Sequence, residues 1–511
     1  MVFLVLKSTQ STELKKSNKS RRTSAGAADK NCKSQCQIER FYIGTIFLNK
    51  IFCVLNYGRE KLVFKSFRNL MLLFSVALLM APVSAKEISS AKPERQGFSS
   101  ERLEKLTQLM NARVDDGTMV GGMGVIARNG KIIYSQTYGQ ADREAGKAMT
   151  DDAIYRIYSM TKPITGVALM MLYEEGKFRL NDPIAMYIPE MADLRVALST
   201  AGTGTVSDGT SSTAIGSGDE TLVGQTRKAI RQPTIRDLMT HTAGLTYGVF
   251  GNTEVDQAYM QAGLLGDMDL KEFVTVLGQL PLQYDPGSQW HYSVSVDVQG
   301  YLVEVFSGMK FGEFLQQRIF APLDMKDTAF KVNEVNKDRL TQLYKPEGVT
   351  ATNYFSPSTG DGLEVADAFV SASYLYGGKF ESGGGGLVAT ARDYLRFSQM
   401  MLNGGELDGV RILSPKTVDL MTTNHIGDLG LGYGSNGIGF GLDFGVVLNP
   451  GDVGEVGSVG EYSWGGAAGT RFWIDPQEQL IGLFMVQSIP HRTRLADDFK
   501  VMTYQALIEK E

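Results

Sequence analysis

Residues 158–190 read YSMTKPITGVALMMLYEEGKFRLNDPIAMYIPE, a stretch that predicts both a buried helix and a reactive serine. The apolar run over residues 160–175 predicts a helix that ends at Gly176. Ser159 and Lys162 stand three residues apart at its start, so they face one side of the helix a turn from each other. A serine becomes nucleophilic when a base lies within hydrogen-bond reach, and a desolvated neutral lysine supplies one. The stretch therefore makes Ser159 a candidate nucleophile and Lys162 a candidate base.

The same Ser-x-x-Lys spacing occurs at two other places in the chain. Ser89 and Lys92 lie near the expected mature N-terminus, and Ser307 and Lys310 are separated by Gly308 at the end of a predicted helix. Neither pair opens a long apolar helix, so neither has a rigid scaffold. The alternative for Ser159 is a serine that only caps its helix, with a lysine on the surface.

Tyr292 follows a turn rich in proline and glycine, in residues 284–294 (YDPGSQWHYSV). Functional residues often lie on loops that a rigid scaffold holds, which makes Tyr292 a candidate for proton transfer. The alternative is a packed aromatic corner with no chemical role.

Small residues mark a second candidate segment, residues 464–470 (WGGAAGT), before a predicted strand at 471–475. Glycines allow a backbone to approach a ligand closely, so Trp464, Gly465 and Gly466 are candidates for substrate binding. The alternative is a glycine bulge in an edge strand.

Neither a metal ion nor a cofactor is expected. The four histidines, His241, His291, His425 and His491, have no metal-binding spacing, and His241 and His291 are interpreted as structural. The glycine run at residues 383–386 lacks the Gly-Lys-Ser/Thr of a phosphate loop, and no strand–GxGxxG–helix unit marks a dinucleotide site.

The net charge of -5 is unevenly distributed along the 511 residues. Residues 1–85 carry 14 basic and 4 acidic side chains, and the remainder carries 37 basic and 52 acidic ones. An acidic body argues against nucleic acid and against an anionic membrane surface as partners. A small-molecule ester or acyl compound is the expected partner, and the sequence carries no indication of an oligomeric state.

Residues 65–85 (KSFRNLMLLFSVALLMAPVSA) have a basic start, an apolar run and a small-residue end, which predicts a secretory signal peptide. The apolar run is too short to span a bilayer, so no stable membrane anchor is expected, and the alternative is a short core helix. Residues 1–64 precede this segment and are interpreted as an upstream extension from a misassigned start. They hold all three cysteines, so the mature, exported chain would need no disulfide.

Strand and helix patterns predict an α/β (α+β) fold. Residues 98–115 predict a helix, and residues 121–138 predict a hairpin around Asn129-Gly130. Helices are expected within 234–240, 269–280, 296–320 and 382–402, and strands within 456–486. Strands at both ends predict an antiparallel sheet flanked by helices, with a mostly helical region inserted. The Ser/Thr/Gly tract at 199–220 is interpreted as a flexible insertion.

Five stretches within residues 95–505 resemble, in this order, the serine β-lactamase and D,D-peptidase superfamily. They are most similar to class C β-lactamases and to the β-lactamase-like carboxylesterases and acyltransferases. The stretches are 158–190, quoted above, 234–245 (TIRDLMTHTAGL), 286–304 (PGSQWHYSVSVDVQGYLVE), 382–409 (SGGGGLVATARDYLRFSQMMLNGGELDG) and 463–476 (SWGGAAGTRFWIDP). Ordered matches of this kind are far more specific than one motif.

The resemblance implies a β-lactamase/transpeptidase-like fold and assigns roles to four residues. Ser159 attacks an acyl carbonyl, and Lys162 and Tyr292 share the base role, with Tyr292 passing protons to and from the leaving group. The backbone N–H groups of Ser159 and Ala467 form an oxyanion hole. An acyl-enzyme forms, and water or an alcohol then removes the acyl group.

Two positions depart from the family pattern. Val294 replaces the Asn of Tyr-x-Asn, and Trp464-Gly465-Gly466 replaces the Lys-Thr-Gly of β-lactamases, so the resemblance implies that Val294 and this triplet contact the substrate. The site would thus lack a partner for a β-lactam's side-chain amide and a cation for its carboxylate. The sequence therefore favours an esterase or transesterase. The alternatives are a β-lactamase or D-Ala-D-Ala carboxypeptidase, and a non-catalytic sensor that binds peptidoglycan or β-lactams.

Overall fold

The computed structural model describes residues 86–198, 225–350, 362–366, 374–432 and 436–510. The predicted upstream extension (1–64), signal peptide (65–85) and insertion (199–220) lie outside these residues. Within the described part of the chain, no helix has the length and apolar character to cross a membrane.

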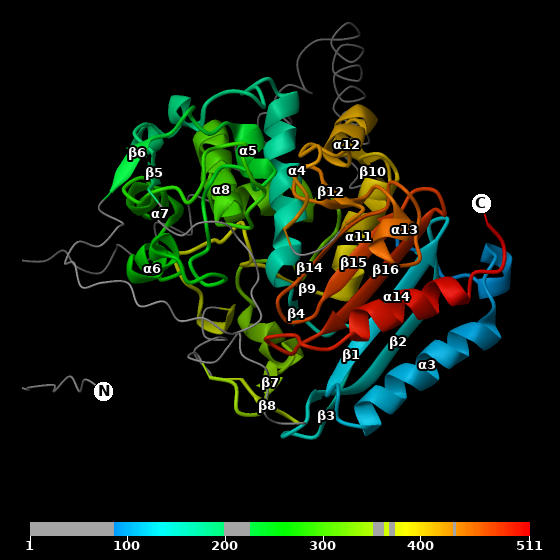
Figure 1. The fold of residues 1–511 in the computed structure, drawn as a ribbon. Helices are drawn as coiled ribbons and strands as arrows, with labels where there is room; N and C mark the ends of the chain where they lie inside the picture. Colours follow the sequence, from blue (N-terminus) through cyan, green and yellow to red (C-terminus); the bar gives the residue numbers. More distant parts are fainter. Residues whose placement is uncertain (1–85, 199–224, 351–361, 367–373, 433–435, 511) are drawn as a thin grey trace, which may run out of the picture. The chain divides into compact units, whose positions relative to one another are not determined.

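An antiparallel sheet of eight strands forms the frame of the fold (Figure 1). Its strand order is β12-β13-β14-β15-β16-β1-β2-β3. The strands are β1 (Gly121–Arg128), β2 (Lys131–Asp142), β3 (Lys147–Ala148), β12 (Ile438–Phe440), β13 (Gly445–Val447), β14 (Tyr462–Gly465), β15 (Arg471–Asp475) and β16 (Leu480–Val486). Because β1 pairs with β16, the two ends of the chain meet inside one sheet, which confirms the predicted α/β architecture.

The first hairpin has the turn that its sequence predicts. Asn129 and Gly130 join β1 to β2 with φ angles of 52° and 68°, the left-handed geometry that asparagine and glycine adopt readily. The sheet therefore starts from a connection that local chemistry determines.

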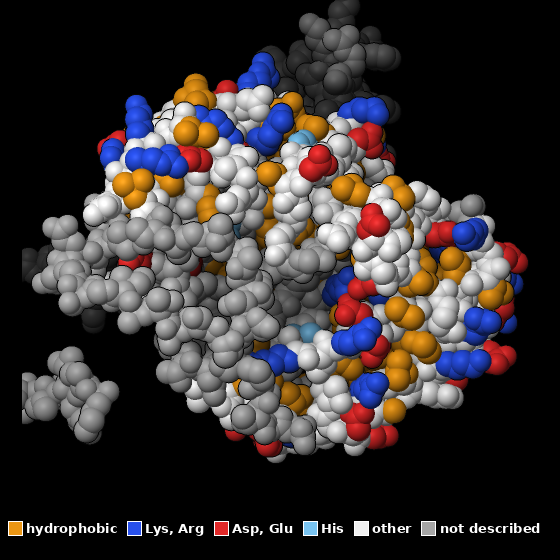
Figure 2. All heavy atoms as spheres, viewed as in Figure 1, with side chains coloured by type: hydrophobic (Ala, Val, Ile, Leu, Met, Phe, Trp, Pro, Cys, Tyr) orange, Lys and Arg blue, Asp and Glu red, His pale blue; other side chains and the backbone are white. Residues whose placement is uncertain are grey.

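Two helices, α3 (Ser100–Asp115) and α14 (Leu495–Gln505), cover one face of the sheet (Figure 1). The Ser99 side chain caps α3 by accepting a hydrogen bond from the Arg102 amide. Leu106 of α3 and Phe499 of α14 pack in one core cluster with Trp473 of β15. Over these helices, basic and acidic side chains are interspersed on the surface (Figure 2).

The other face of the sheet packs against the largest core cluster. Along β1, Val125 belongs to this cluster and Ile126 to the one under α3, because successive strand residues point to opposite faces. This second layer contains α4 (Thr161–Glu174), α8 (Ser295–Ser307) and α11 (Ala391–Leu402), all closely packed in the core.

The inserted region is mostly helical. Its helices include α5 (Ile235–Met239), α6 (Glu254–Gln261), α7 (Leu270–Leu277), α8 and α9 (Phe311–Leu315), followed by α11, α12 (Pro415–Met421) and α13 (Pro450–Val453). The short strands pair as β4 (Tyr155–Arg156) with β9 (Val388–Ala389), β5 (Arg195–Ala197) with β6 (Thr226–Lys228), β7 (Tyr344–Pro346) with β8 (Leu363–Val365), and β10 (Glu406–Leu407) with β11 (Val410–Arg411). The segment predicted as one helix at 296–320 is interrupted, because α8 ends at Gly308 with a φ of 71°.

Candidate active site

Ser159 lies in a short 3₁₀ turn, Tyr158–Met160, that leads into α4. The residue before it, Tyr158, has a φ of 43°, in the left-handed region that residues with a side chain rarely adopt. Such backbone strain clusters at functional sites, where the surrounding structure holds it in place. The turn leaves Ser159 partly exposed at the start of a helix whose first residues are buried.

Lys162 is fully buried and turned toward Ser159. Its Nζ lies 3.3 Å from the Ser159 Oγ, 2.9 Å from the Tyr247 hydroxyl and 2.5 Å from the Gly384 carbonyl oxygen. A lysine ammonium has three N–H donors, and three oxygen atoms surround this one. The structure thus brings together Ser159 and Lys162, as the sequence predicts.

Tyr247 belongs to the site and was missed by the sequence reasoning. It comes from the segment after α5, two residues beyond the Leu245 that ends the quoted stretch 234–245. Burial, followed by the nearby Asp297 charge, raises the pKa of Tyr247 well above its usual value, so its hydroxyl stays neutral. No spacing rule connects it to Ser159, and only its place beside a quoted motif could have drawn attention to it.

Tyr292 also reaches Lys162, but through its ring. The Lys162 Nζ lies 4.6 Å from the centre of the Tyr292 ring, a cation–π distance. Within the described residues, the Tyr292 hydroxyl has no hydrogen-bond partner, so it is open to a substrate or a leaving group. The ring packs against Tyr247 (5.3 Å), Trp464 (5.7 Å) and His241 (4.8 Å).

His241 supports this aromatic cluster from behind. It is fully buried, and its Nδ1 accepts a hydrogen bond from the Ser293 amide at 3.3 Å. Burial, and then the positive charge of Lys162, lower the pKa of His241 well below its usual value, so the ring is neutral. Its position fits a structural residue that fixes the loop bearing Tyr292.

The Trp464–Thr470 segment forms the turn between β14 and β15. Because β14 lies between β13 and β15, it is an interior strand, which excludes the edge-strand alternative. A side-chain carbon on Gly466 would lie 2.5 Å from the Ile157 carbonyl oxygen, so this glycine lets the turn pack beside the residue that precedes Tyr158. Ala467 is exposed, and its N–H group has no acceptor among the described residues. Gly465 is paired with Arg471 in the sheet.

Val294 and Arg471 take no direct part in the open site. Val294 has none of its surface exposed and precedes α8, so its side chain is not brought to the position where the sequence predicts substrate contact. Arg471, the cation next to the Trp464 turn, forms ion pairs with Asp497 and Glu455. Its charge is therefore already compensated.

The two other Ser-x-x-Lys serines have ordinary structural roles. The Ser89 Oγ accepts a hydrogen bond from Lys131, and the Ser307 hydroxyl donates to the Val303 carbonyl oxygen. Lys310 pairs with Glu304 and Asp269.

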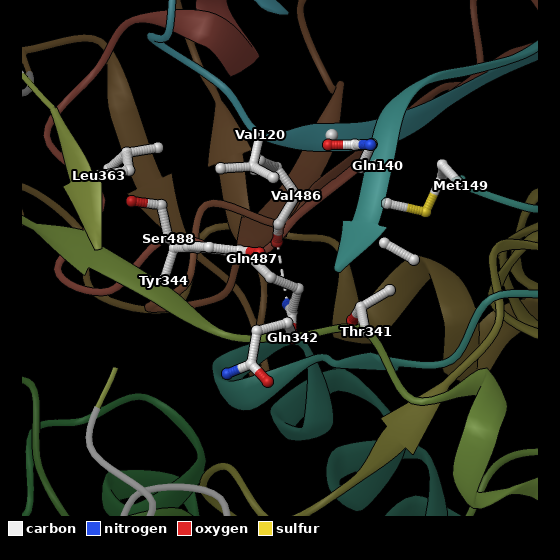
Figure 3. Close-up of a pocket in the computed structure, with 12 residues that line it drawn as sticks. Val120, Gln140, Met149, Thr341, Gln342, Tyr344, Leu363, Val486, Gln487 and Ser488 are labelled. Carbon is white, nitrogen blue, oxygen red and sulfur yellow. Dashed lines mark hydrogen bonds between the residues drawn. The ribbon is translucent and has the colours of Figure 1, made fainter. Parts of the chain in front are cut away.

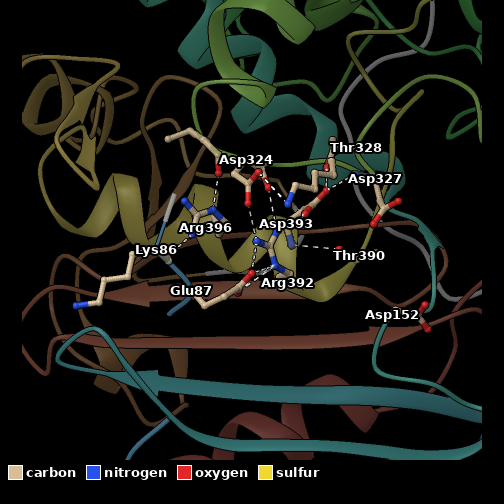
Figure 4. Close-up of polar contacts among 12 residues, drawn as sticks. Lys86, Glu87, Asp152, Asp324, Asp327, Thr328, Thr390, Arg392, Asp393 and Arg396 are labelled. Atoms are coloured by element: carbon tan, nitrogen blue, oxygen red, sulfur yellow. Dashed lines mark hydrogen bonds and ion pairs between the residues drawn. The ribbon is translucent and has the colours of Figure 1, made fainter. Parts of the chain in front are cut away.

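Two cavities lie away from Ser159 and are lined by other residues. A cavity of about 10 Å³ beside Gln487 and Thr341 has room for one water molecule (Figure 3). A larger hollow of about 280 Å³ lies beside Arg392 and Arg396 of α11, where carboxylates and carbonyl oxygens bind both guanidinium groups (Figure 4). Among the described residues, no group of His, Cys, Asp and Glu side chains is arranged to hold a metal ion.

Comparison with known proteins identifies the fold and the family. The family model for beta-lactamase matches residues 106–504. The chain belongs to the beta-lactamase family. It is a serine hydrolase of that family, and the Ser159–Lys162 pair described above lies at the start of α4.

The relatives of this beta-lactamase-family chain have names that denote different activities. It is 29% identical to the esterase EstB of Burkholderia gladioli, over 73% of this chain and 86% of EstB. It is 28% identical to a putative D-alanyl-D-alanine carboxypeptidase of Escherichia coli K12, over 82% of this chain and 91% of the relative. Among solved structures, EstCE1, described as a hydrolase with promiscuous acyltransferase activity, matches with a TM-score of 0.66 at 25% identity, covering 79% of this chain and 99% of EstCE1.

Proposed function

We propose that this beta-lactamase-family protein is an exported esterase or transesterase that forms an acyl-enzyme on Ser159. The observation that carries the proposal is the 3.3 Å approach of the Lys162 Nζ to the Ser159 Oγ, in a site whose neighbouring surface is aromatic. EstB and EstCE1 support ester chemistry, since one is named an esterase and the other a hydrolase with acyltransferase activity.

Each residue has a defined task in this reaction. Ser159 loses its proton to Lys162 and attacks the acyl carbonyl, and Tyr292 passes the proton to the leaving alcohol. The N–H groups of Ser159 and Ala467 receive the developing oxyanion, at about 3 kcal/mol of transition-state stabilisation per donor. Water or a second alcohol then takes the acyl group from Ser159.

Two features favour an ester over a β-lactam. A β-lactam carboxylate would face the Trp464 ring, because Arg471 is engaged by Asp497 and Glu455, and an uncompensated charge costs several kcal/mol. The apolar, buried Val294 gives no hydrogen bond to a substrate amide, at a cost of about 1–3 kcal/mol. A short-chain aryl ester has neither group and suffers neither penalty.

Active-site labelling tests the nucleophile. A fluorophosphonate probe should modify Ser159, located by mass spectrometry, and Ser159→Ala should abolish labelling while the protein keeps its unfolding temperature. Labelling of Ser89 or Ser307 instead would overturn the assignment. Absence of any labelling would favour the non-catalytic sensor.

Substrate selectivity tests the reaction. We expect kcat/KM for p-nitrophenyl butyrate to exceed that for benzylpenicillin by at least about 10²-fold, since 1.36 kcal/mol corresponds to tenfold in rate. Expression of the protein should confer no penicillin resistance on a sensitive bacterium. Efficient hydrolysis of benzylpenicillin, or of a D-Ala-D-Ala peptide as the relative's name would imply, would contradict the proposal.

Export is part of the same proposal. The basic, apolar and small-residue layout of residues 65–85 supports a cleaved signal peptide that ends at Ala85. A site that needs no cysteine, metal ion or soluble cofactor suits a reaction outside the cytoplasm.

A further inference from the structure

Gly384 connects Lys162 to a buried carboxyl group that no catalytic motif contains. Its carbonyl oxygen accepts the Lys162 ammonium at 2.5 Å, while its N–H group donates to the Asp297 Oδ1 at 3.0 Å. The Ser382 hydroxyl donates to the same Oδ1 at 2.5 Å. A side-chain carbon on Gly384 would lie 2.5 Å from the Tyr247 hydroxyl and 2.8 Å from the Asp297 Oδ2. Only glycine therefore allows this close arrangement of lysine, tyrosine and carboxyl.

Asp297 is fully buried in the first turn of α8, directly after the loop that bears Tyr292. Its Oδ2 has no hydrogen-bond partner among the described residues and faces Gly384 beside the Tyr247 hydroxyl. A buried carboxylate oxygen without a hydrogen bond is costly, so a nearby positive charge must compensate it. The positive charge that acts on Asp297 here is Lys162.

Several titratable groups face Lys162, and their surroundings determine which of them is charged. Burial raises the pKa of both Asp297 and Asp443, the latter in the turn between β12 and β13, and it does so much more strongly for Asp443. Asp297 keeps two hydrogen-bond donors, whereas the Gln299 amide alone donates to Asp443. Asp443, whose pKa burial raises well above its usual value, is assigned as the neutral acid, and the two donors at Asp297 favour its carboxylate form.

The remaining neighbours of Lys162 add no negative charge. His241 is neutral because burial and Lys162 lower its pKa, and Tyr247 is neutral because burial and Asp297 raise its pKa. Tyr292 presents its ring face to the lysine. Among the described groups that face Lys162, Asp297 is thus the one whose hydrogen bonds most favour a negative charge.

We propose that Asp297 is a positioning residue that orients Lys162 toward Ser159 through Gly384, and that its carboxyl group controls the pH range in which Ser159 reacts. The inference rests on the proposed role of Lys162 as base. Asp297 accepts a hydrogen bond from the Gly384 N–H group and so holds the residue whose carbonyl oxygen accepts the Lys162 hydrogen bond. A negative charge at Asp297 favours a proton on the groups that it faces, so it opposes transfer of the Ser159 proton at low pH.

The test is the pH dependence of fluorophosphonate labelling at Ser159, measured on the purified protein. Asp297→Asn keeps an oxygen acceptor for the Gly384 N–H and Ser382 hydroxyl groups, and it removes the negative charge. A negative charge favours protonation of its neighbours, so its removal should move the acid limb of the labelling profile, the pH range over which the rate rises, to lower pH by about one unit or more. A purely structural role would lower the labelling rate at every pH and leave the limb in place.

Two further variants complete the design. Ser382→Ala removes one donor from the Asp297 carboxylate and should move the acid limb less, in the same direction; it decides the question if Asp297→Asn does not fold. Asp443→Asn replaces the group assigned as neutral and should leave the limb where the wild-type protein has it. The role of Asp297 would be overturned if the acid limb of the labelling profile stayed at the wild-type pH in both Asp297→Asn and Ser382→Ala. It would also be overturned if the limb moved in Asp443→Asn alone. Failure of the wild-type protein to label at Ser159 would instead overturn the proposed function.

Discussion

Two tyrosines stand beside Lys162 in different geometries, and this difference predicts different consequences for their loss. The Tyr292 hydroxyl has no partner among the described residues, and the family resemblance makes it the proton carrier to the leaving group. Tyr292→Phe should lower kcat for p-nitrophenyl butyrate by about 10²–10⁴-fold, the range of general acid–base catalysis. The ring and its packing against His241 remain, so the unfolding temperature should change little.

Tyr247→Phe is the matched comparison. It removes a hydroxyl that lies 2.9 Å from the Lys162 Nζ, and Lys162 keeps its contacts with Gly384 and Ser159. A hydrogen bond to a charged group contributes about 1.5–3 kcal/mol, which corresponds to roughly ten- to a hundredfold in rate. A loss below threefold in Tyr292→Phe together with a larger loss in Tyr247→Phe would transfer the proton-carrying role to Tyr247.

At the residue scale, the sequence predicts what lies within one helical turn. Ser159 and Lys162 are three positions apart, so helix geometry alone brings them together. Tyr247 is 85 positions from Lys162 and Gly384 is 222 positions away. Such contacts depend on how whole helices and strands pack, and the periodic spacing of residues within one helix or strand does not indicate them. Asp297 was part of a quoted stretch, yet nothing in the sequence shows that its carboxyl group faces the lysine.

At the element scale, the turn between β14 and β15 positions the Ala467 N–H group. A methyl group on Gly466 would lie 2.2 Å from the Thr470 Oγ1 and 2.5 Å from the Ile157 carbonyl oxygen, so Gly466→Ala must move the turn. Loss of one oxyanion-hole donor costs about 10²–10³-fold in kcat. We expect Gly466→Ala to approach this loss in stopped-flow acylation measurements.

Gly465→Ala provides the control in the same motif. There the added methyl group would meet only the Thr470 carbonyl oxygen, at 3.3 Å, a contact that a small shift relieves. This variant should retain clearly more activity than Gly466→Ala. Equal losses in both variants would show that the motif acts through something other than the position of the turn.

Elements with a strong local signal were predictable from the sequence. The Asn129-Gly130 hairpin, the helix capped by Ser99 and the strands β15 and β16 occur where local patterns place them. The strands β12 and β13, three residues each, were not predicted, because such short segments show no period and gain their stability from pairing inside the sheet. The expected helical segment at 296–320 is divided in the structure, and α8 ends at Gly308, the glycine that the sequence already places at the end of a helix.

At the scale of the whole molecule, the segment that would follow a cleaved signal peptide is tied to the helical layer. The Lys86 amide donates to the Asp408 Oδ2 at 3.2 Å, and the buried Arg396 donates to the same oxygen at 2.7 Å (Figure 4 shows Lys86 and Arg396). Arg396 also donates to the Lys86 carbonyl oxygen at 2.9 Å, and Arg392 pairs with Glu87. A little further on, the Ala91 amide donates to the carbonyl oxygen of Ile132 in β2.

This arrangement predicts the mature N-terminus. Cleavage after Ala85 would turn the Lys86 amide nitrogen into an α-ammonium group beside the Asp408 carboxylate, which strengthens the existing contact. When the full chain is expressed and exported by a bacterium, N-terminal sequencing of the extracytoplasmic protein should therefore begin at Lys86. A start beyond Ser90 would remove the whole contact with Asp408 and would contradict this assignment.

The same contact predicts a measurable effect on stability. A protein that begins at Lys86 places a positive charge next to Asp408, whereas one that begins at Ser84 has an uncharged amide there. The Asp408 side chain is 20% exposed, so the added charge pair should raise the free energy of unfolding by about 0.5–1 kcal/mol, measured by urea denaturation at low ionic strength. Because the effect requires the carboxylate, Asp408→Asn should make the two proteins equally stable, and 1 M salt should reduce the difference. Equal stabilities of the two proteins with Asp408 intact would show that the new N-terminus gains nothing from this site.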